Sequence, residues 1–172
     1  PDGTGQTVFF GNMHGGGAYL DAKPIPSPEK TRDPKVVMIH SPGHGRTEHL
    51  GYIEIVDPSR GPDSRAQVKR ITPNPEWRDP YPLTLNAKPP GKQWFLAAGP
   101  GASKMSCVSE TGEVVTFYQL PPSEAKANMW LQEPRPICGR PRERVIPPRV
   151  KLGEGKGSAL LQDVYIGRNM QG

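Results

Sequence analysis

The sequence predicts an all-β protein, and three observations support this fold class. The 20 glycines and 22 prolines stand between short apolar runs, where they act as turn signals. The runs are rich in β-branched and aromatic residues, which strands favour. Only residues 123–131 carry a helix signal, with Ser123 as the candidate N-cap. The predicted strands are residues 36–39, 52–56, 67–71, 93–97, 104–109 and 113–120.

Residues 36–72 show the expected arrangement of these strands most clearly. A short apolar strand leads into a glycine loop that carries His40 and His44, and a second strand follows. A tight turn at residues 57–61 then precedes the third strand. Successive strands joined by short polar turns pair most readily as an antiparallel meander. Such a meander cannot bury both of its faces alone, so we expect a neighbouring sheet.

The same pattern recurs along the chain. Three phrases with alternate prolines begin at Pro24, Pro80 and Pro134, which stand 56 and 54 positions apart. One unit reads as a proline phrase, a loop, a strand, a glycine loop, a strand, an acidic turn with glycine and a last strand. Residues 7–10 resemble the last strand of a preceding unit. Recurrence at a fixed spacing indicates a repeat architecture.

A repeat of this size predicts a β-propeller. A period of about 55 residues with three or four antiparallel strands is the size of one propeller blade. The chain would hold about two blades, which cannot close a ring. We therefore predict a partial β-propeller in an internal fragment of a larger polypeptide. A β-sandwich is the structural alternative, although sandwiches do not require a repeated proline phrase.

The pattern ends after the third proline phrase. We predict propeller blades in residues 1–133, a basic connector rich in proline and glycine in residues 134–157, and the start of the next domain in residues 158–172. The last predicted strand spans residues 159–166 and follows a glycine-rich run. The connector is a Pro/Arg-rich exit segment from the propeller.

The charge of the chain is concentrated in this connector. The net charge is +5, and residues 134–156 hold seven basic residues against two acidic ones, so the rest of the chain is neutral. The connector has no aromatic residues between its charges, unlike a typical nucleic-acid-binding face. We therefore predict a solvated connector and no nucleic acid partner. No apolar run approaches the length of a membrane span.

Histidines supply the candidate metal ligands. All four histidines precede residue 50, and the spacing of His40, His44 and His49 suits a loop that brings imidazoles to one ion. The spacing matches no zinc module, and no His-Glu-x-x-His motif is present. The alternative is a structural loop in which His44 fills a turn between glycines. We therefore predict His40, His44 and His49 as candidate ligands of a metal ion.

Other chemical motifs are weak. The two cysteines, Cys107 and Cys138, are too few for a cysteine-based zinc site, and Cys107 fits a small buried side chain in a strand. No nucleophile elbow, phosphate loop or Cys-x-x-Cys-His motif occurs. Glu54 and Asp57 lie in a strand and its turn, where a solvated or capping role is expected. We predict no catalytic residue. Three tryptophans are expected to pack between blades or to cover the ends of blades: Trp77, Trp94 and Trp130.

The order of several phrases resembles the middle domain of hydrazine synthase alpha subunits and of similar planctomycete proteins. Each phrase is weak alone, but together they cover nearly the whole chain in the same order. The family often carries a paired histidine where this chain has only Gly43-His44-Gly45, so His44 alone is carried over. The phrases are Pro-Asp-Gly-Thr (1–4), Ala-Lys-Pro-Ile-Pro (22–26), Gly-His-Gly (43–45), Ile-Val-Asp-Pro (55–58), Asp-Pro-Tyr-Pro-Leu (79–83), Pro-Arg-Pro-Ile (134–137), Val-Ile-Pro-Pro-Arg-Val (145–150) and Leu-Gln-Asp-Val-Tyr-Ile-Gly (161–167).

The resemblance implies a β-propeller domain in a large exported polypeptide, extracytoplasmic or periplasmic, whose flanking regions carry c-type haem. The fragment would be a scaffold that positions redox or catalytic modules and would not be an enzyme itself, while the parent would be an oxidoreductase. Its partners would be the remaining blades and haem domains of the same polypeptide and, in a complex, other subunits. The alternatives are a protein-interaction propeller without a redox role and a metal-dependent enzyme that uses the histidine loop.

Overall fold

The structure is a computed structural model, and its chain divides into two units that are described separately. Residues 8–139 form one compact unit, and residues 1–7 with 140–172 form the other. The described residues are 8–11, 17–26, 34–43, 49–62, 64–83, 91–127, 129–139, 142, 145, 147, 150–151 and 153–157. The described part of residues 140–172 has no helix or strand, and in it Lys151 Nζ forms an ion pair with Glu154 Oε1 at 3.0 Å.

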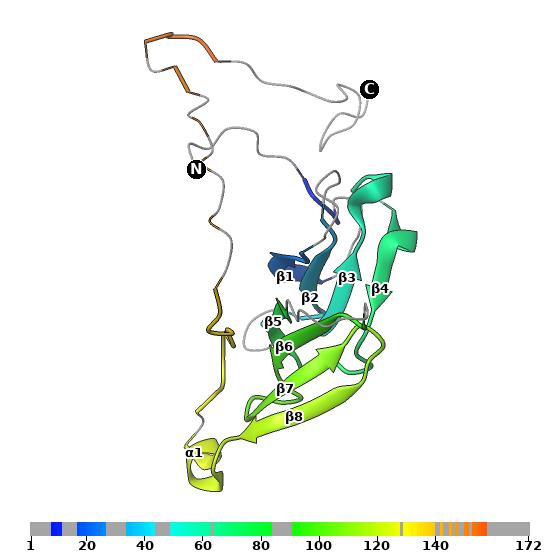
Figure 1. Ribbon diagram of the computed structural model, residues 1–172, viewed down its shortest axis with the longest axis vertical. Coiled ribbons are helices and arrows are strands. Elements are labelled where there is room, and N and C mark those ends of the chain that lie inside the picture. Colours follow the sequence, from blue (N-terminus) through cyan, green and yellow to red (C-terminus); the bar gives the residue numbers. More distant parts are fainter. Residues whose placement is uncertain are drawn as a thin grey trace. The chain divides into compact units, whose positions relative to one another are not determined.

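The first sheet is a meander of four antiparallel strands. Its spatial order is β1-β2-β3-β4, the same as the order in the sequence (Figure 1). Two short 3₁₀ helices, η2 (Pro58–Arg60) and η3 (Arg65–Gln67), connect the last two strands. The four strands are β1 (Ala18–Pro24), β2 (Val36–Ser41), β3 (Tyr52–Val56) and β4 (Val68–Arg70).

The second sheet repeats this arrangement. Its order is β5-β6-β7-β8, again antiparallel and sequential, and the short helix α1 (Pro122–Lys126) follows it. In the described residues, no helix has the length and apolar character that a membrane crossing requires. The strands are β5 (Arg78–Leu83), β6 (Trp94–Ala98), β7 (Lys104–Ser109) and β8 (Val114–Gln119).

The predicted all-β class is confirmed, and the predicted strands match β2, β3, β4, β6, β7 and β8 within a few residues. Three details of the prediction are wrong. The proline phrases at Pro24 and Pro80 do not precede the first strand of each repeat. They lie in that strand, β1 or β5, so each repeat is a sheet of four strands. The helix is only five residues long and starts at Pro122. Residues 8–10 form no strand, and residue 7 lies outside the described part.

Prolines fit in β1 and β5 because these strands are edges. A proline cannot donate a hydrogen bond to the ladder, so it is tolerated in a strand whose N–H groups face away from the neighbour or at a bulge. Both strands contain such an irregularity, between Leu20 and Lys23 in β1 and between Arg78 and Tyr81 in β5. The proline phrases therefore mark the first edge strand of each sheet.

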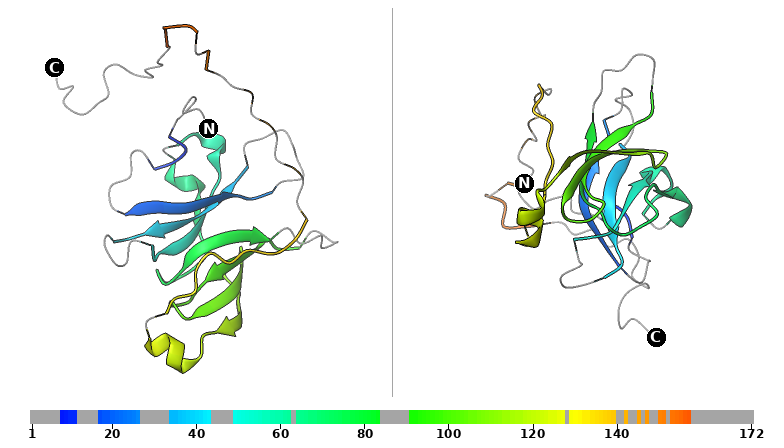
Figure 2. Two further views of the ribbon diagram at one scale, coloured as in Figure 1. Left: turned by 90° about the vertical axis from the view of Figure 1, so that its left-hand side faces the viewer. Right: turned by 90° about the horizontal axis from the view of Figure 1, so that it is seen from below.

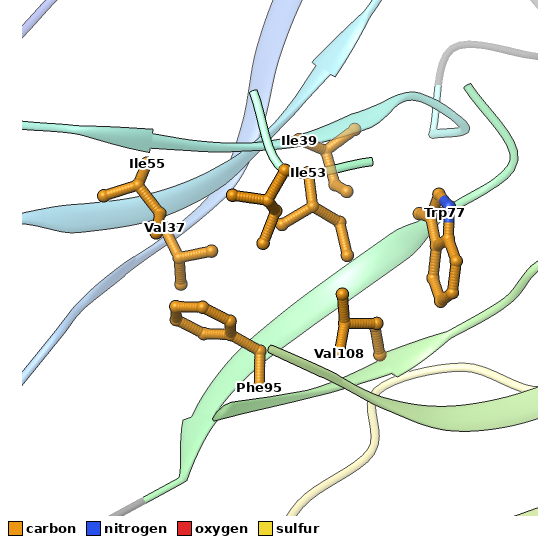
Figure 3. Packing of buried hydrophobic residues seen from close by; sticks show 9 residues of the cluster. Val37, Ile39, Ile53, Ile55, Trp77, Phe95 and Val108 are labelled. Carbon is orange, nitrogen blue, oxygen red and sulfur yellow. The ribbon is translucent and has the colours of Figure 1, made fainter. Parts of the chain in front are cut away.

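One hydrophobic core joins the two sheets, which stack face to face (Figure 2). Figure 3 shows Val37 of β2 and Phe95 of β6 pointing toward each other, and both are fully buried. Trp77, at the entrance to β5, closes one side of this core and is 3% exposed, as predicted for a tryptophan between sheets. The core consists of Val37, Ile39, Ile53, Ile55, Ile71, Trp77, Phe95, Ala97 and Val108.

The first sheet has a second apolar face. Val36, Met38 and Val56 alternate with the core residues along β2 and β3, so they point away from the second sheet. Phe10 packs against this cluster and contacts Tyr19 edge to face, with ring centroids 5.3 Å apart. Residues 8–11 therefore cover part of this face, although they are not a strand.

Candidate functional site

A bulge at the same place in β1 and β5 turns one acidic side chain out of each strand. Asp21 follows Leu20 and Asp79 follows Arg78, both inside the register shift. Their backbones have φ of 54° and 52°, in the left-handed region that non-glycine residues seldom adopt. Bulges commonly re-aim a side chain in this way. The two sheets thus present an equivalent carboxylate from their first edge strands.

Glu133 is the third member of this series. It stands directly before the third proline phrase, and its φ is 48°. Asp21, Asp79 and Glu133 are the described non-glycine residues with a positive φ, and each can place one carboxylate oxygen within 4.8 Å of the other two. We call these three residues the acidic cluster. Residues about 55 positions apart in the sequence therefore converge, one from each proline phrase.

The acidic cluster is held together by the backbone. The N–H of Glu133 donates to Asp79 Oδ2 at 2.9 Å, and Asp79 is only 9% exposed. Equivalent contacts are also made two residues before Asp79 and two residues before Glu133. Trp77 exchanges two backbone hydrogen bonds with Gly51, and Leu131 donates to Ala102 O at 2.9 Å. The segment of Glu133 thus lies against β5 and occupies the position that follows β5 in the series.

The acidic cluster concentrates negative charge in a partly buried place. Burial, followed by the negative charge of Asp79, raises the pKa of the Asp21 carboxyl, while Lys23 opposes the rise. Asp21 Oδ2 is buried and has no hydrogen-bond partner. The raised pKa extends the pH range over which the Asp21 carboxyl stays neutral. Oxygen atoms of this kind also suit Ca²⁺ or Mg²⁺, although acidic groups often gather without an ion.

Two arginines lie over aromatic rings beside the acidic cluster. The guanidinium of Arg78 lies 4.6 Å from the ring centroid of Trp130, and that of Arg135 lies 4.7 Å from the ring of Tyr81. Arg135 also forms an ion pair with Glu133. Arg78 is 3% exposed, and its Nε and Nη2 atoms have no hydrogen-bond partner. These contacts fasten the residues around the third proline phrase to β5.

The structure places His40 in a second polar group, on the face of the first sheet that points away from the second. His40 Nδ1 lies 3.2 Å from Glu54 Oε1, and Arg70 Nε donates to the same oxygen at 2.8 Å. His40 stacks on Tyr19 at 4.7 Å between ring centroids, and Arg70 covers Tyr52 at 3.7 Å. Because Glu54 is 2% exposed, the histidine and the arginine compensate a buried carboxylate.

The predicted histidine ligands are not seen together in the described residues. His40 directs Nδ1 to Glu54, His49 is exposed in the turn before β3, and His44 lies outside the described residues. The remaining ring nitrogen of His40, Nε2, faces Gly17, where an added Cβ would lie 2.7 Å away. A metal site of His40, His44 and His49 therefore stays a prediction.

Other residues singled out in the sequence have structural roles. Asp57 accepts a hydrogen bond from the N–H of Ser59 at 3.0 Å and caps η2, and the hydrogen bonds from the side chain and then the backbone of Ser59 lower the pKa of its carboxyl. Cys107 is a half-buried free thiol in β7 whose pKa is raised by burial. Cys138 is an exposed free thiol. Trp130 is 41% exposed and covers Arg78.

Sequence reasoning recognised the proline phrases but missed the acidic cluster. The signal was an acidic residue at the start of each phrase: Asp79 and Glu133 directly precede a proline, and Asp21 stands three residues before Pro24. A proline phrase indicates a loop, and loop carboxylates are usually solvated, so the pattern alone does not predict the acidic cluster. Comparisons of the chain with family models, with curated proteins and with solved structures give no match.

Proposed function

We propose that this chain is a structural scaffold: part of a β-propeller in a large exported multihaem protein similar to hydrazine synthase alpha subunits. It holds redox or catalytic modules of the same polypeptide in place, and it performs no chemistry itself. The c-type haem belongs to the flanking regions, outside the propeller, in the periplasm or another extracytoplasmic compartment. The partners are the remaining blades, the haem domains and the other subunits of a complex.

The observation that carries the scaffold role is the repeated geometry of the first edge strands. Asp21, Asp79 and Glu133 come from three successive units and meet in one cluster. In a propeller, the first strand of each blade lines the centre of the ring, so equivalent residues of successive blades meet there. The hydrogen bond from the Glu133 N–H to Asp79 Oδ2 joins the third proline phrase to the first strand of the second sheet.

The scaffold proposal predicts a specific defect in the parent polypeptide. Phe95→Ala removes a fully buried ring between the sheets, whereas Phe9→Ala removes a ring that is 41% exposed. We expect both variants to keep their covalent haem, since the attachment cysteines lie elsewhere. Electron transfer between the modules should fall at least ~10-fold in Phe95→Ala only, because the rate depends on how the modules are positioned. Both quantities follow from a haem stain and from stopped-flow reduction.

Two results would overturn the proposal. A flanking polypeptide without any Cys-x-x-Cys-His motif would remove the haem-linked role and leave a protein-interaction propeller. A metal ion in the parent protein that is lost in both His44→Ala and His49→Ala would instead support an enzyme built on the histidine loop. Metal analysis of the wild type and these two variants separates that outcome from a scaffold.

A further inference from the structure

Arg78 is a buried cation that pairs with none of the acidic side chains in the described part of the chain. It is 3% exposed, and its Nε and Nη2 atoms have no hydrogen-bond partner. Its guanidinium lies 4.6 Å from the ring centroid of Trp130. Contact with an aromatic ring offsets only part of the cost of burying a charge, which an anionic partner usually compensates. The buried guanidinium therefore indicates a site for an anion.

The fold does not require a charge at this position. Arg78 stands directly before the bulge of β5, and Leu20 stands at the equivalent position of β1. Leu20 is apolar and packs against the hydrophobic core between the sheets. The same four-stranded meander is therefore built with an apolar side chain in the first sheet, and the buried charge of Arg78 has no structural counterpart there.

The two nitrogens without a partner form one complete binding edge of the guanidinium. Nε and Nη2 stand side by side, so their N–H bonds are directed to the same side and can donate to both oxygens of one carboxylate. Ala98 lies next to Arg78 across the ladder and is 1% exposed, and its small side chain occupies little of the space there. Trp130 covers the guanidinium and is itself 41% exposed, so its ring lies between Arg78 and the solvent.

The charge around Arg78 favours a carboxylate over a phosphate. Asp79, the next residue in the chain, is 9% exposed and belongs to the acidic cluster. A phosphate carries up to two negative charges at neutral pH, and the acidic cluster would repel the second one. A carboxylate carries one negative charge and matches the planar guanidinium with two parallel hydrogen bonds.

We propose that Arg78 and Trp130 form a binding site for the carboxylate of a small organic acid. Arg78 donates from Nε and Nη2 to the two carboxylate oxygens, and the indole of Trp130 closes over the pair. The indole must move when the ligand enters, because Arg78 is buried beneath it. Trp130 lies in the described residues 129–139, which contain no helix or strand, so no regular element has to break for this movement. This site goes beyond the scaffold role and does not depend on haem.

Trp130 reports on the binding because its ring lies over the guanidinium of Arg78. Sodium acetate is the probe, added to the chain 1–172 at pH 7 in exchange for sodium chloride, so that the ionic strength stays constant. We expect a saturable change in tryptophan fluorescence with a midpoint on the order of 1–10 mM, within the affinity that so small a ligand can reach. Trp130→Phe should lose this change, although Trp77 and Trp94 remain in the variant.

Substitutions of arginine separate the effect of the two parallel bonds from that of the charge. Arg78→Lys keeps the charge but cannot form both bonds, so the midpoint should rise at least ~10-fold. Arg78→Met should lose the response, and it should fold, since Leu20 occupies the equivalent position of β1. The matched control is Arg135, which lies 4.7 Å from the ring centroid of Tyr81 but is paired with Glu133. Arg135→Met should keep the midpoint within about twofold of the wild type.

Thermal unfolding gives a second measurement, which does not depend on the fluorescence of Trp130. Acetate at about 100 mM, in place of chloride, should raise the Tm of the wild type and of Arg135→Met by about 2–5 °C and leave that of Arg78→Met unchanged. Three results overturn the proposal: no saturable change with acetate in the wild type, the same response in Arg78→Met, or tighter binding of phosphate than of acetate at equal ionic strength. The haem measurements on the parent polypeptide test the scaffold role separately.

Discussion

Asp21, Asp79 and Glu133 are the residues at which local conformation and electrostatics are both unfavourable. A left-handed backbone costs about 1–3 kcal/mol at a non-glycine residue, and close carboxylates repel one another. Glycine or asparagine would avoid the first cost, yet all three phrases carry an acid at this point. The contacts around these residues must therefore offset the strain. They are the bulges in β1 and β5 and the hydrogen bond that joins Glu133 to Asp79 of the preceding proline phrase.

The raised pKa of Asp21 gives the protein a predictable dependence on pH. A carboxyl whose pKa is higher in the folded state than its ordinary value of 3.8 contributes stability that is present below pH 3.8 and lost as the pH rises through the folded pKa. Asp21→Asn removes this loss. We expect the variant to be more stable than the wild type at both pH values, because asparagine tolerates the left-handed backbone, and the difference should be larger at pH 7 than near pH 3. Urea unfolding at the two pH values measures the difference.

Asp57 supplies a control with the opposite sign. Its pKa is lowered by the hydrogen bonds from Ser59, so its contribution to stability is present above its ordinary pKa and is lost as the pH falls. Asp57→Asn should therefore reduce stability at pH 7 and have little effect at low pH. An Asp21→Asn variant that is less stable than the wild type at pH 7 would contradict the electrostatic account of the acidic cluster.

Arg70 has a larger effect than its exposed position suggests. Its side chain is 46% exposed, but it donates to Glu54, whose side chain is 3% exposed. Arg70→Ala leaves the buried carboxylate of Glu54 with only its contact to His40 among the described side chains, and we expect a loss of about 2–3 kcal/mol in the free energy of unfolding. Lys35→Ala breaks an exposed ion pair with Asp57 and should cost less than about 1 kcal/mol. Equal losses in the two variants would contradict this role of Glu54.

Glu54 illustrates what the sequence could not provide at the scale of residues. Its position in a strand with alternating polar and apolar residues predicts a solvated side chain. The structure buries it because His40 and Arg70 arrive on the same face from β2 and β4. This pairing depends on the register between three strands, which no local pattern encodes. The capping role of Asp57 was predictable because it depends only on the next two residues.

At the scale of elements, six of the eight strands could be predicted because they combine apolar runs with flanking turn signals. The two first edge strands, β1 and β5, could not be predicted, because proline is rare in strands. Proline is tolerated in edge strands, but the sequence does not show which strands lie at an edge. The short α1 was overestimated because its helix signal continues past Lys126, where no packing partner supports it. Local patterns thus gave the elements, and tertiary position decided the exceptions.

Gly51 tests a close approach to β2 within the first sheet, at the residue that also bonds to Trp77. A Cβ at Gly51 would lie 2.6 Å from Ile39 Cγ2 and closer still to the carbonyl oxygen of His40. Gly51 also exchanges backbone hydrogen bonds with Trp77, which directly precedes the first strand of the second sheet. Gly51→Ala must therefore displace β2 or break this junction, and we expect a loss of about 3 kcal/mol. Thermal unfolding of the purified variant measures the loss.

Gly61 is the matched control for Gly51. It has a φ of 89°, but an added Cβ would meet no atom within 4 Å. Gly61→Ala should therefore cost less than Gly51→Ala, since it adds only the strain of a positive φ and no crowding. If Gly61→Ala proves as harmful as Gly51→Ala, crowding against β2 is not what makes Gly51 necessary.

At the scale of the whole molecule, the two sheets are one folding unit because they share a core. Each sheet has its own meander, but Val37 and Ile39 of the first are fully buried only where Phe95 and Ala97 of the second cover them. A repeat protein gains most of its stability from such contacts between neighbouring units. The repeat could be predicted from the sequence, whereas the acidic cluster required the fold to bring three distant phrases together.

Phe95 provides the test of this shared core. Its ring is fully buried between the sheets, so Phe95→Ala should reduce the free energy of unfolding of residues 1–172 by about 3–5 kcal/mol. The substitution leaves a cavity between the two sheets, so amide exchange should accelerate in β2 and β3 as much as in β6 and β7. Phe9→Ala, at a residue that is 41% exposed, should change neither quantity appreciably. Faster exchange confined to the second sheet would mean that the two sheets fold independently and that the repeat contributes no common core.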